Sequence, residues 1–147
     1  MKQPEVLRPL AALQETLAGE HAAVFVYGVL GGRVSSVNDP VTADRLRAAY
    51  EAHRARRDQL RSSIADLDTV PVPAAPAYDV DVRSRAATEL LATARGVEER
   101  CAAVYTQLVA SSTEGQRRWA VVALTDAAVR LLDLGGLPTA YPGATEL

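Results

Sequence analysis

The sequence predicts an all-α fold, an antiparallel four-helix bundle. Four long stretches repeat apolar residues every three or four positions, which is the spacing of one face of a helix. Glycine- or proline-containing breaks separate these stretches, and no run alternates apolar and polar residues as a strand would. The length of 147 residues suits one domain, so we expect a single domain over 1–147.

Composition excludes several classes of protein. With 48% hydrophobic and 23% charged residues, the chain resembles an ordinary globular protein. A net charge of −2 provides no positive field for nucleic acid, and no apolar run approaches the roughly 18 residues of a membrane helix. The single cysteine, Cys101, allows no internal disulfide. The first residues lack the pattern of a secretory signal, so we expect a cytoplasmic protein.

Two helices are predicted in the first half of the chain, over about 9–34 and about 43–67. Gly31-Gly32 and Asn38-Asp39-Pro40 lie between them and favour a break. Both apolar stripes have a polar centre. The first stripe consists of Leu10, Leu13, Leu17, Glu20, Val24 and Tyr27, and the second of Leu46, Tyr50, His53, Arg57, Leu60, Ile64 and Leu67.

Residues 68–81 are predicted to form a crossover between the two halves. Pro71, Pro73 and Pro76 prevent a helix and favour an extended polyproline conformation. At about 3.1 Å per residue, this segment can span most of a 25-residue helix. One long crossover is the connectivity of ferritin-like bundles. The alternative is a plain up-down bundle in which this segment is a loose surface loop.

The second half predicts helices over about 82–110 and about 114–134, followed by a tail, 135–147, after Gly135-Gly136. The last helix is apolar nearly all round. Its apolar residues are Trp119, Val121, Val122, Leu124, Val129 and Leu131. Because a bundle covers only one side of each helix, another chain or the tail must cover the second side. We therefore expect a homodimer.

An interior polar cluster is predicted because the helix midpoints lie at one level in an antiparallel bundle. Its candidate members are Glu20, Tyr50, His53, Arg57, Glu98 and Asp126. Buried charges cost several kcal/mol each unless they are paired or bind a metal. We expect Glu20 to pair with His53 or Arg57, and we assign no catalytic residue.

The chain resembles the ferritin-like superfamily, and more closely the ferritin-like family of unknown function numbered 4439. Three segments carry the resemblance: Glu20-His21-Ala22-Ala23 with Tyr27-Gly28, the run Ala52 to Asp58 (AHRARRD), and the proline-rich crossover. The resemblance covers nearly the whole chain and implies a ferritin-like bundle. It implies no activity, because none is established for that family.

Di-iron members of the superfamily use one Glu on each of two helices and Glu-x-x-His on the other two. Glu20 and Glu98 match the single glutamates, but Tyr50 stands three residues before His53, and Val129 three residues after Asp126. The ligand set is therefore incomplete, and we expect a non-catalytic protein without a cofactor. The alternative is a metal-dependent oxidase, di-iron or mononuclear, or an iron-handling protein, with Glu20, His53 and Glu98 as ligands.

Overall fold

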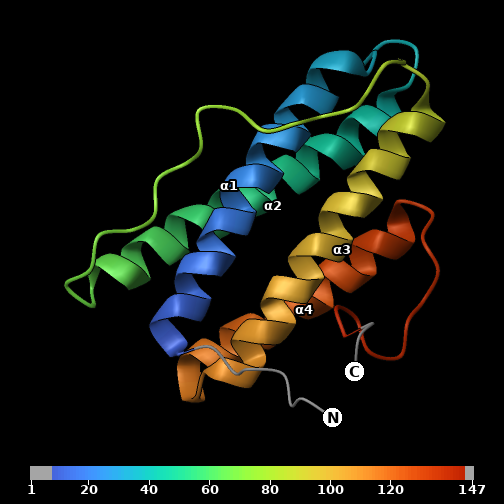
Figure 1. Cartoon of the computed structure of the whole chain (residues 1–147). Coiled ribbons are helices and arrows are strands. Elements are labelled where there is room, and N and C mark those ends of the chain that lie inside the picture. Colours follow the sequence, from blue (N-terminus) through green and yellow to red (C-terminus); the bar gives the residue numbers. More distant parts are fainter. Residues whose placement is uncertain (1–7, 145–147) are drawn as a thin grey trace.

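The computed structural model describes residues 8–144 and confirms the all-α four-helix bundle. The helices are α1 (Pro9–Arg33), α2 (Pro40–Ala65), α3 (Ala87–Ser111) and α4 (Glu114–Asp133). The two helices of each hairpin run in opposite directions, α1 with α2 and α3 with α4, whereas α2 and α3 run in the same direction because the long link returns the chain to the end where α2 begins (Figure 1). No helix within residues 8–144 is both long enough and apolar enough to span a membrane.

Helix α2 begins at Pro40, three residues earlier than its sequence pattern predicts. The side chain of Asp39 accepts a hydrogen bond from the Thr42 N–H at 3.1 Å, and Pro40 occupies the first helical position. Proline is favoured there because its fixed φ suits a helix and its missing N–H would have no intrahelical partner. Pro40 therefore starts the helix instead of preceding it.

The link between α2 and α3 occupies residues 66–86, longer than the predicted 68–81, because α3 begins at Ala87 and not near 82. Two bonds hold the last part of this link outside the helix. The N–H of Arg83 donates to Glu89 Oε1 at 3.0 Å, and the N–H of Ala86 donates to Ser84 Oγ at 2.8 Å. The extended segment thus carries a buried residue, Val82, into the core.

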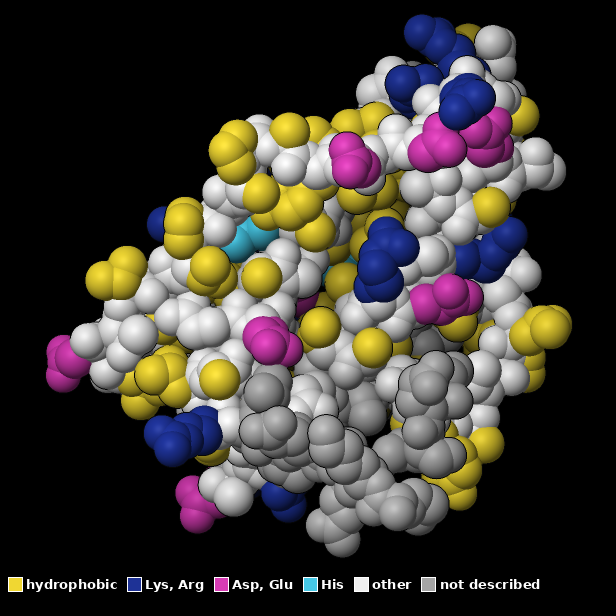
Figure 2. All heavy atoms as spheres, viewed as in Figure 1, with side chains coloured by type: hydrophobic (Ala, Val, Ile, Leu, Met, Phe, Trp, Pro, Cys, Tyr) yellow, Lys and Arg dark blue, Asp and Glu magenta, His cyan; other side chains and the backbone are white. Residues whose placement is uncertain are grey.

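The link is a crossover bonded along α1. The Gln14 amide donates to the Val70 carbonyl at 2.8 Å and accepts from the Val72 N–H at 2.7 Å. The His21 ring also contacts the Val72 carbonyl at 2.9 Å. Figure 2 shows apolar side chains gathered where the crossover lies on α1. These contacts distinguish the segment from a loose loop.

The core consists of two apolar layers, one at each end of the bundle. The larger layer includes Tyr27, Leu30, Leu46, Leu90, Val97, Tyr105, Ala123 and Leu134. The smaller layer includes Leu13, Leu17, Leu60, Ile64, Leu108 and Ala120. On α1, Glu20 falls between the residues of the two layers, and on α2 His53 does the same. The polar cluster therefore lies between the two layers.

The tail after α4 folds back onto α3. Arg95 donates to the Leu134 carbonyl at 2.8 Å, and the Thr106 hydroxyl donates to the Pro142 carbonyl at 2.8 Å. Gly143 has a φ of 74°, and a Cβ there would lie 2.2 Å from the Ala102 carbonyl oxygen. Only glycine fits so close an approach, so the chain is held against α3 both at Leu134 and at 142–143.

We predict that Gln14→Ala lowers the free energy of unfolding by about 1–2 kcal/mol, because it removes both amide bonds to the crossover. Chemical denaturation measures the loss, and limited proteolysis should show faster cleavage within 66–86. Glu15→Ala, at the exposed neighbouring position, is the matched control. Equal stability of the two variants would show that the crossover does not depend on Gln14.

Candidate functional site

The centre of the bundle holds three fully buried polar side chains from three helices. Glu20 of α1 is 1% exposed, and His53 of α2 and Glu98 of α3 are 0% exposed. Glu20 and His53 occupy stripe positions of their helices, and Glu98 lies beside the α3 stripe on the same line as Leu91 and Tyr105. The structure thus brings together three of the residues proposed from the sequence.

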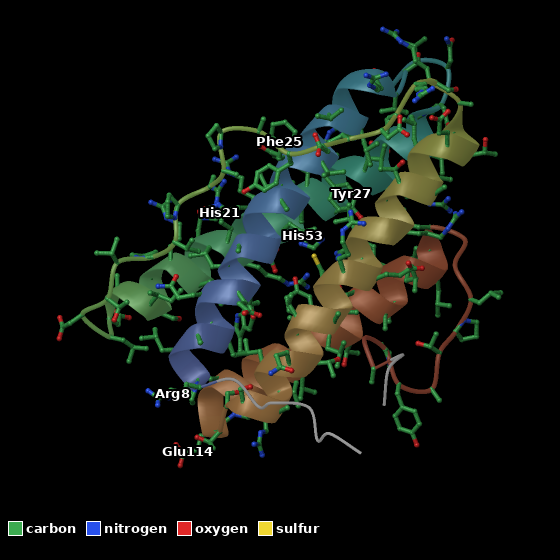
Figure 3. The ribbon with its side chains drawn as sticks, in the orientation of Figure 1. Arg8, His21, Phe25, Tyr27, His53 and Glu114 are labelled. Carbon is green, nitrogen blue, oxygen red and sulfur yellow. The ribbon has the colours of Figure 1, made fainter. Side chains whose placement is uncertain are left out.

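His53 bridges the two glutamates. Figure 3 labels His53 and Tyr27, which lie close together inside the bundle. Its Nδ1 lies 2.7 Å from Glu20 Oε2, and its Nε2 lies 3.0 Å from Glu98 Oε1. The Tyr27 ring stacks on the imidazole, with ring centroids 5.3 Å apart and an interplanar angle of 19°. One side chain of α2 is therefore bonded to both α1 and α3.

This geometry favours a positively charged imidazolium. Ionised carboxylates only accept hydrogen bonds, so a histidine placed between two of them must donate from both ring nitrogens. Burial alone would lower the pKa of His53, but the hydrogen bonds and charges of Glu20 and Glu98 outweigh it and raise that pKa above its ordinary value. The charge is thus stabilised by its two partners.

Two tyrosines bond the same carboxylates in a crossed pattern. Tyr27 of α1 donates to Glu98 Oε1 of α3 at 2.5 Å, and Tyr105 of α3 donates to Glu20 Oε1 of α1. Burial, followed by the nearby glutamate charges, raises the pKa of both phenols, which therefore stay protonated as donors. Each of the two helices supplies one glutamate and one tyrosine to the other.

A second group of charges adjoins the cluster on the side of α4. Arg56 of α2 pairs with Asp126 of α4, and its guanidinium also reaches the Tyr105 hydroxyl at 3.4 Å. Arg130 lies 3.0 Å from Asp126 Oδ2 and 3.8 Å from Glu98 Oε2. When His53 is protonated, three cationic side chains balance three carboxylates. The network then involves all four helices.

Not every residue predicted for the cluster joins it. The prediction of Arg57 as a cluster member is wrong. Arg57 pairs with the neighbouring exposed Asp58 at 2.8 Å, and Arg56 takes the interior position. Tyr50 lines a surface pocket between α1 and α2 and forms no hydrogen bond to the cluster within residues 8–144. Asp126 lies at the edge, with 41% of its side chain exposed.

Tyr27, Tyr105, Arg56 and Arg130 were missed as cluster members. A signal for the tyrosines exists in the sequence, since Glu20 and Tyr27 are separated by seven residues, as are Glu98 and Tyr105. Seven residues are about two helical turns, so the two members of each pair share a face. No comparable signal marks the arginines.

In this arrangement the polar atoms of the cluster are bonded mainly to one another. Within residues 8–144, no three His, Cys, Asp or Glu side chains are placed to hold a metal ion. Both ring nitrogens of His53 face carboxylates, whereas a ligating imidazole directs one nitrogen at the metal. Glu98 Oε2 has no hydrogen-bond partner among the described residues.

Comparisons with known proteins agree with this fold. Residues 12–146 match the model of a family described as a domain of unknown function (DUF4439). The crystal structure of a conserved hypothetical protein from Mycobacterium tuberculosis is similar, with a TM-score of 0.78 and 24% sequence identity over 91% of this chain and 98% of that one. No curated protein matches the chain significantly.

We predict that Arg56→Ala and Arg57→Ala differ in stability. Arg56→Ala removes the partner of Asp126 and the support of Tyr105, and should cost about 1–3 kcal/mol of unfolding free energy. Arg57→Ala removes a surface pair and should cost less than about 0.5 kcal/mol. Urea denaturation of both variants measures this. A larger loss of unfolding free energy for Arg57→Ala than for Arg56→Ala would show that Arg57, and not Arg56, takes the interior position.

A second prediction concerns pH. Because the pKa of His53 is raised on folding, its contribution is fully present below the unfolded value of about 6.5 and is lost as pH rises through the folded pKa. The stability difference between the wild type and His53→Gln should therefore shrink towards high pH. His21→Gln, which removes the other histidine, serves as the control. A difference that grows with pH would contradict a charged His53.

Proposed function

The chain belongs to the DUF4439 family of domains of unknown function, and on that premise we propose that it is a non-catalytic ferritin-like module. In this proposal, an internal ion-pair network occupies the level at which di-iron members of the superfamily bind metal. The network sets the register of the four helices. The observation that carries the proposal is that His53 forms one hydrogen bond to Glu20 and another to Glu98.

The residues present do not fit a di-iron centre. Such a centre needs Glu-x-x-His on two helices, and neither α2 nor α4 has this motif. Instead, two guanidinium groups lie beside the carboxylates, those of Arg56 and Arg130. They supply positive charge where two irons would supply it.

A register-setting role follows from the cost of breaking the cluster. A charge that is buried without its partner costs several kcal/mol, so any shift of α2 along α1 or α3 that separates His53 from the glutamates is penalised. An apolar core would accept such shifts more readily, because hydrophobic contacts have no direction. The network thus favours one alignment of the helices.

A metal-dependent protein is the second candidate, and one observation favours it. Two carboxylates and one imidazole converge from three helices, and Glu98 Oε2 lacks a hydrogen-bond partner among residues 8–144. If His53 rotated, one of its nitrogens and this oxygen would become available to a cation. Iron handling or oxidation would then be the activity to expect.

The test is metal loading. The protein, purified without chelator, is incubated with ferrous iron under air, desalted and subjected to elemental analysis, with the melting temperature measured before and after. We expect no stoichiometric metal and no change in melting temperature, because His53 and the arginines already neutralise the carboxylates. Glu98→Gln removes one carboxylate while keeping the side-chain shape, and is the matched variant.

Stoichiometric iron in the wild type that is lost in Glu98→Gln would overturn the proposal and favour the metal-dependent candidate. Iron retained by Glu98→Gln would be bound elsewhere and would leave the cluster metal-free. A double-mutant cycle with Glu20→Gln and His53→Gln provides independent support. It should show a coupling energy of about 1–3 kcal/mol, as expected for buried partners.

A further inference from the structure

Helix α4 carries several large apolar side chains on the face that is turned away from the bundle. The residues that it buries are small, namely Ala120, Ala123 and Ala127. Trp119 and Leu124 are partly buried against the core, but four other large apolar residues face outward, with Val121 46%, Val122 68%, Val129 52% and Leu132 45% exposed. Single exposed apolar residues are ordinary, but a continuous row of them marks a contact surface.

Three of these residues form one stripe together with Thr125. At 100° per residue, Val122, Thr125, Val129 and Leu132 fall on a common face, directly opposite the three buried alanines. The described part of the tail, residues 135–144, does not cover this stripe, because Pro142 and Gly143 lie against α3. Nothing else within residues 8–144 buries it either, as the exposed fractions show.

The ends of the stripe carry opposite charges. Arg118 lies on the same face near the start of α4, and Asp133 lies beside that face at its end. Both are exposed, and neither forms an ion pair with another described residue. A surface that is apolar in the middle, positive at one end and negative at the other complements itself when a second copy is turned by 180°.

We propose that this stripe is the interface of a homodimer in which α4 packs antiparallel against α4 of a second copy. A two-fold axis near Thr125 places Val122 against Val129 of the partner subunit. It also places Arg118 beside Asp133 of the partner subunit. Because a two-fold interface repeats every contact, both ends gain an ion pair and the apolar stripe residues Val122, Val129 and Leu132 are covered.

The antiparallel register distinguishes a second copy from other occupants. In a parallel pair, Arg118 would face Arg118 and Asp133 would face Asp133, so like charges would oppose each other. An anionic membrane would be attracted to the Arg118 end and repelled by the Asp133 end. Of the occupants that an apolar stripe can take, an inverted copy of itself matches both ends.

Light scattering coupled to size-exclusion chromatography tests the proposal. We expect a dimer for the wild type. Arg118→Glu and Asp133→Arg should each raise the dimer dissociation constant roughly tenfold or more, because each places like charges together. The double variant, R118E with D133R, should restore the dimer. If either single variant weakened the dimer only by disturbing the fold of its own chain, the double variant would not restore dimer formation.

Cysteine crosslinking tests the register. Cys101 is buried and is the only cysteine, so an introduced thiol is the only accessible one. Thr125→Cys lies near the proposed axis and should oxidise to a covalent dimer, whereas Ser62→Cys, exposed on α2, should not.

Three outcomes would overturn the proposal. A monomeric wild type would exclude a dimer. A dimer that persists in Val122→Asp, with helical circular dichroism intact, would lie on another face. A dimer that is lost in Val122→Asp but is indifferent to both charge changes would use the same stripe in a different register.

Discussion

The bridge made by His53 is the constraint on which the rest of the structure depends. Helix α2 packs on α1 along its length but touches α3 only slightly, so the bond from His53 to Glu98 is a main link between them. Burying two carboxylates is unfavourable unless cations accompany them. The imidazolium provides one such cation, and it does so with a bond to each carboxylate. Arg56 and Arg130 provide the others at the boundary with α4.

The crossed bonds of Tyr27 and Tyr105 give the cluster an internal repetition. In each hairpin the first helix carries a glutamate and, two turns later, a tyrosine that bonds the glutamate of the other hairpin. The second helices differ, since α2 contributes His53 and Arg56, whereas α4 contributes Asp126 and Arg130. The two halves therefore share an arrangement of helices but contribute different polar residues. The result is an ion-pair network in which imidazolium and guanidinium groups carry the positive charge.

Periodicity and proline content were enough to predict four helices and a crossover, because these signals are local. The inward positions of Glu20 and His53 followed from the same periodicity. Periodicity did not decide that of Glu98, because Glu98 stands beside the main apolar stripe of its helix and next to Glu99 and Arg95. The choice between Arg56 and Arg57 could not follow, since residues three and four after His53 both lie near its face. Asp126, on a different helix, decides it. The start of α3 was misplaced because Val82 suits a core equally well as part of a helix or of an extended segment.

The most direct test of the account is the protonation state of His53. Nuclear magnetic resonance of the protein labelled with nitrogen-15 at histidine reports on both ring nitrogens at neutral pH. Nδ1 and Nε2 of His53 should both be protonated. Addition of ferrous iron under anaerobic conditions should leave the signals of both nitrogens unchanged. A neutral ring with one bare nitrogen, or His53 signals that disappear or shift with stoichiometric iron, would contradict it.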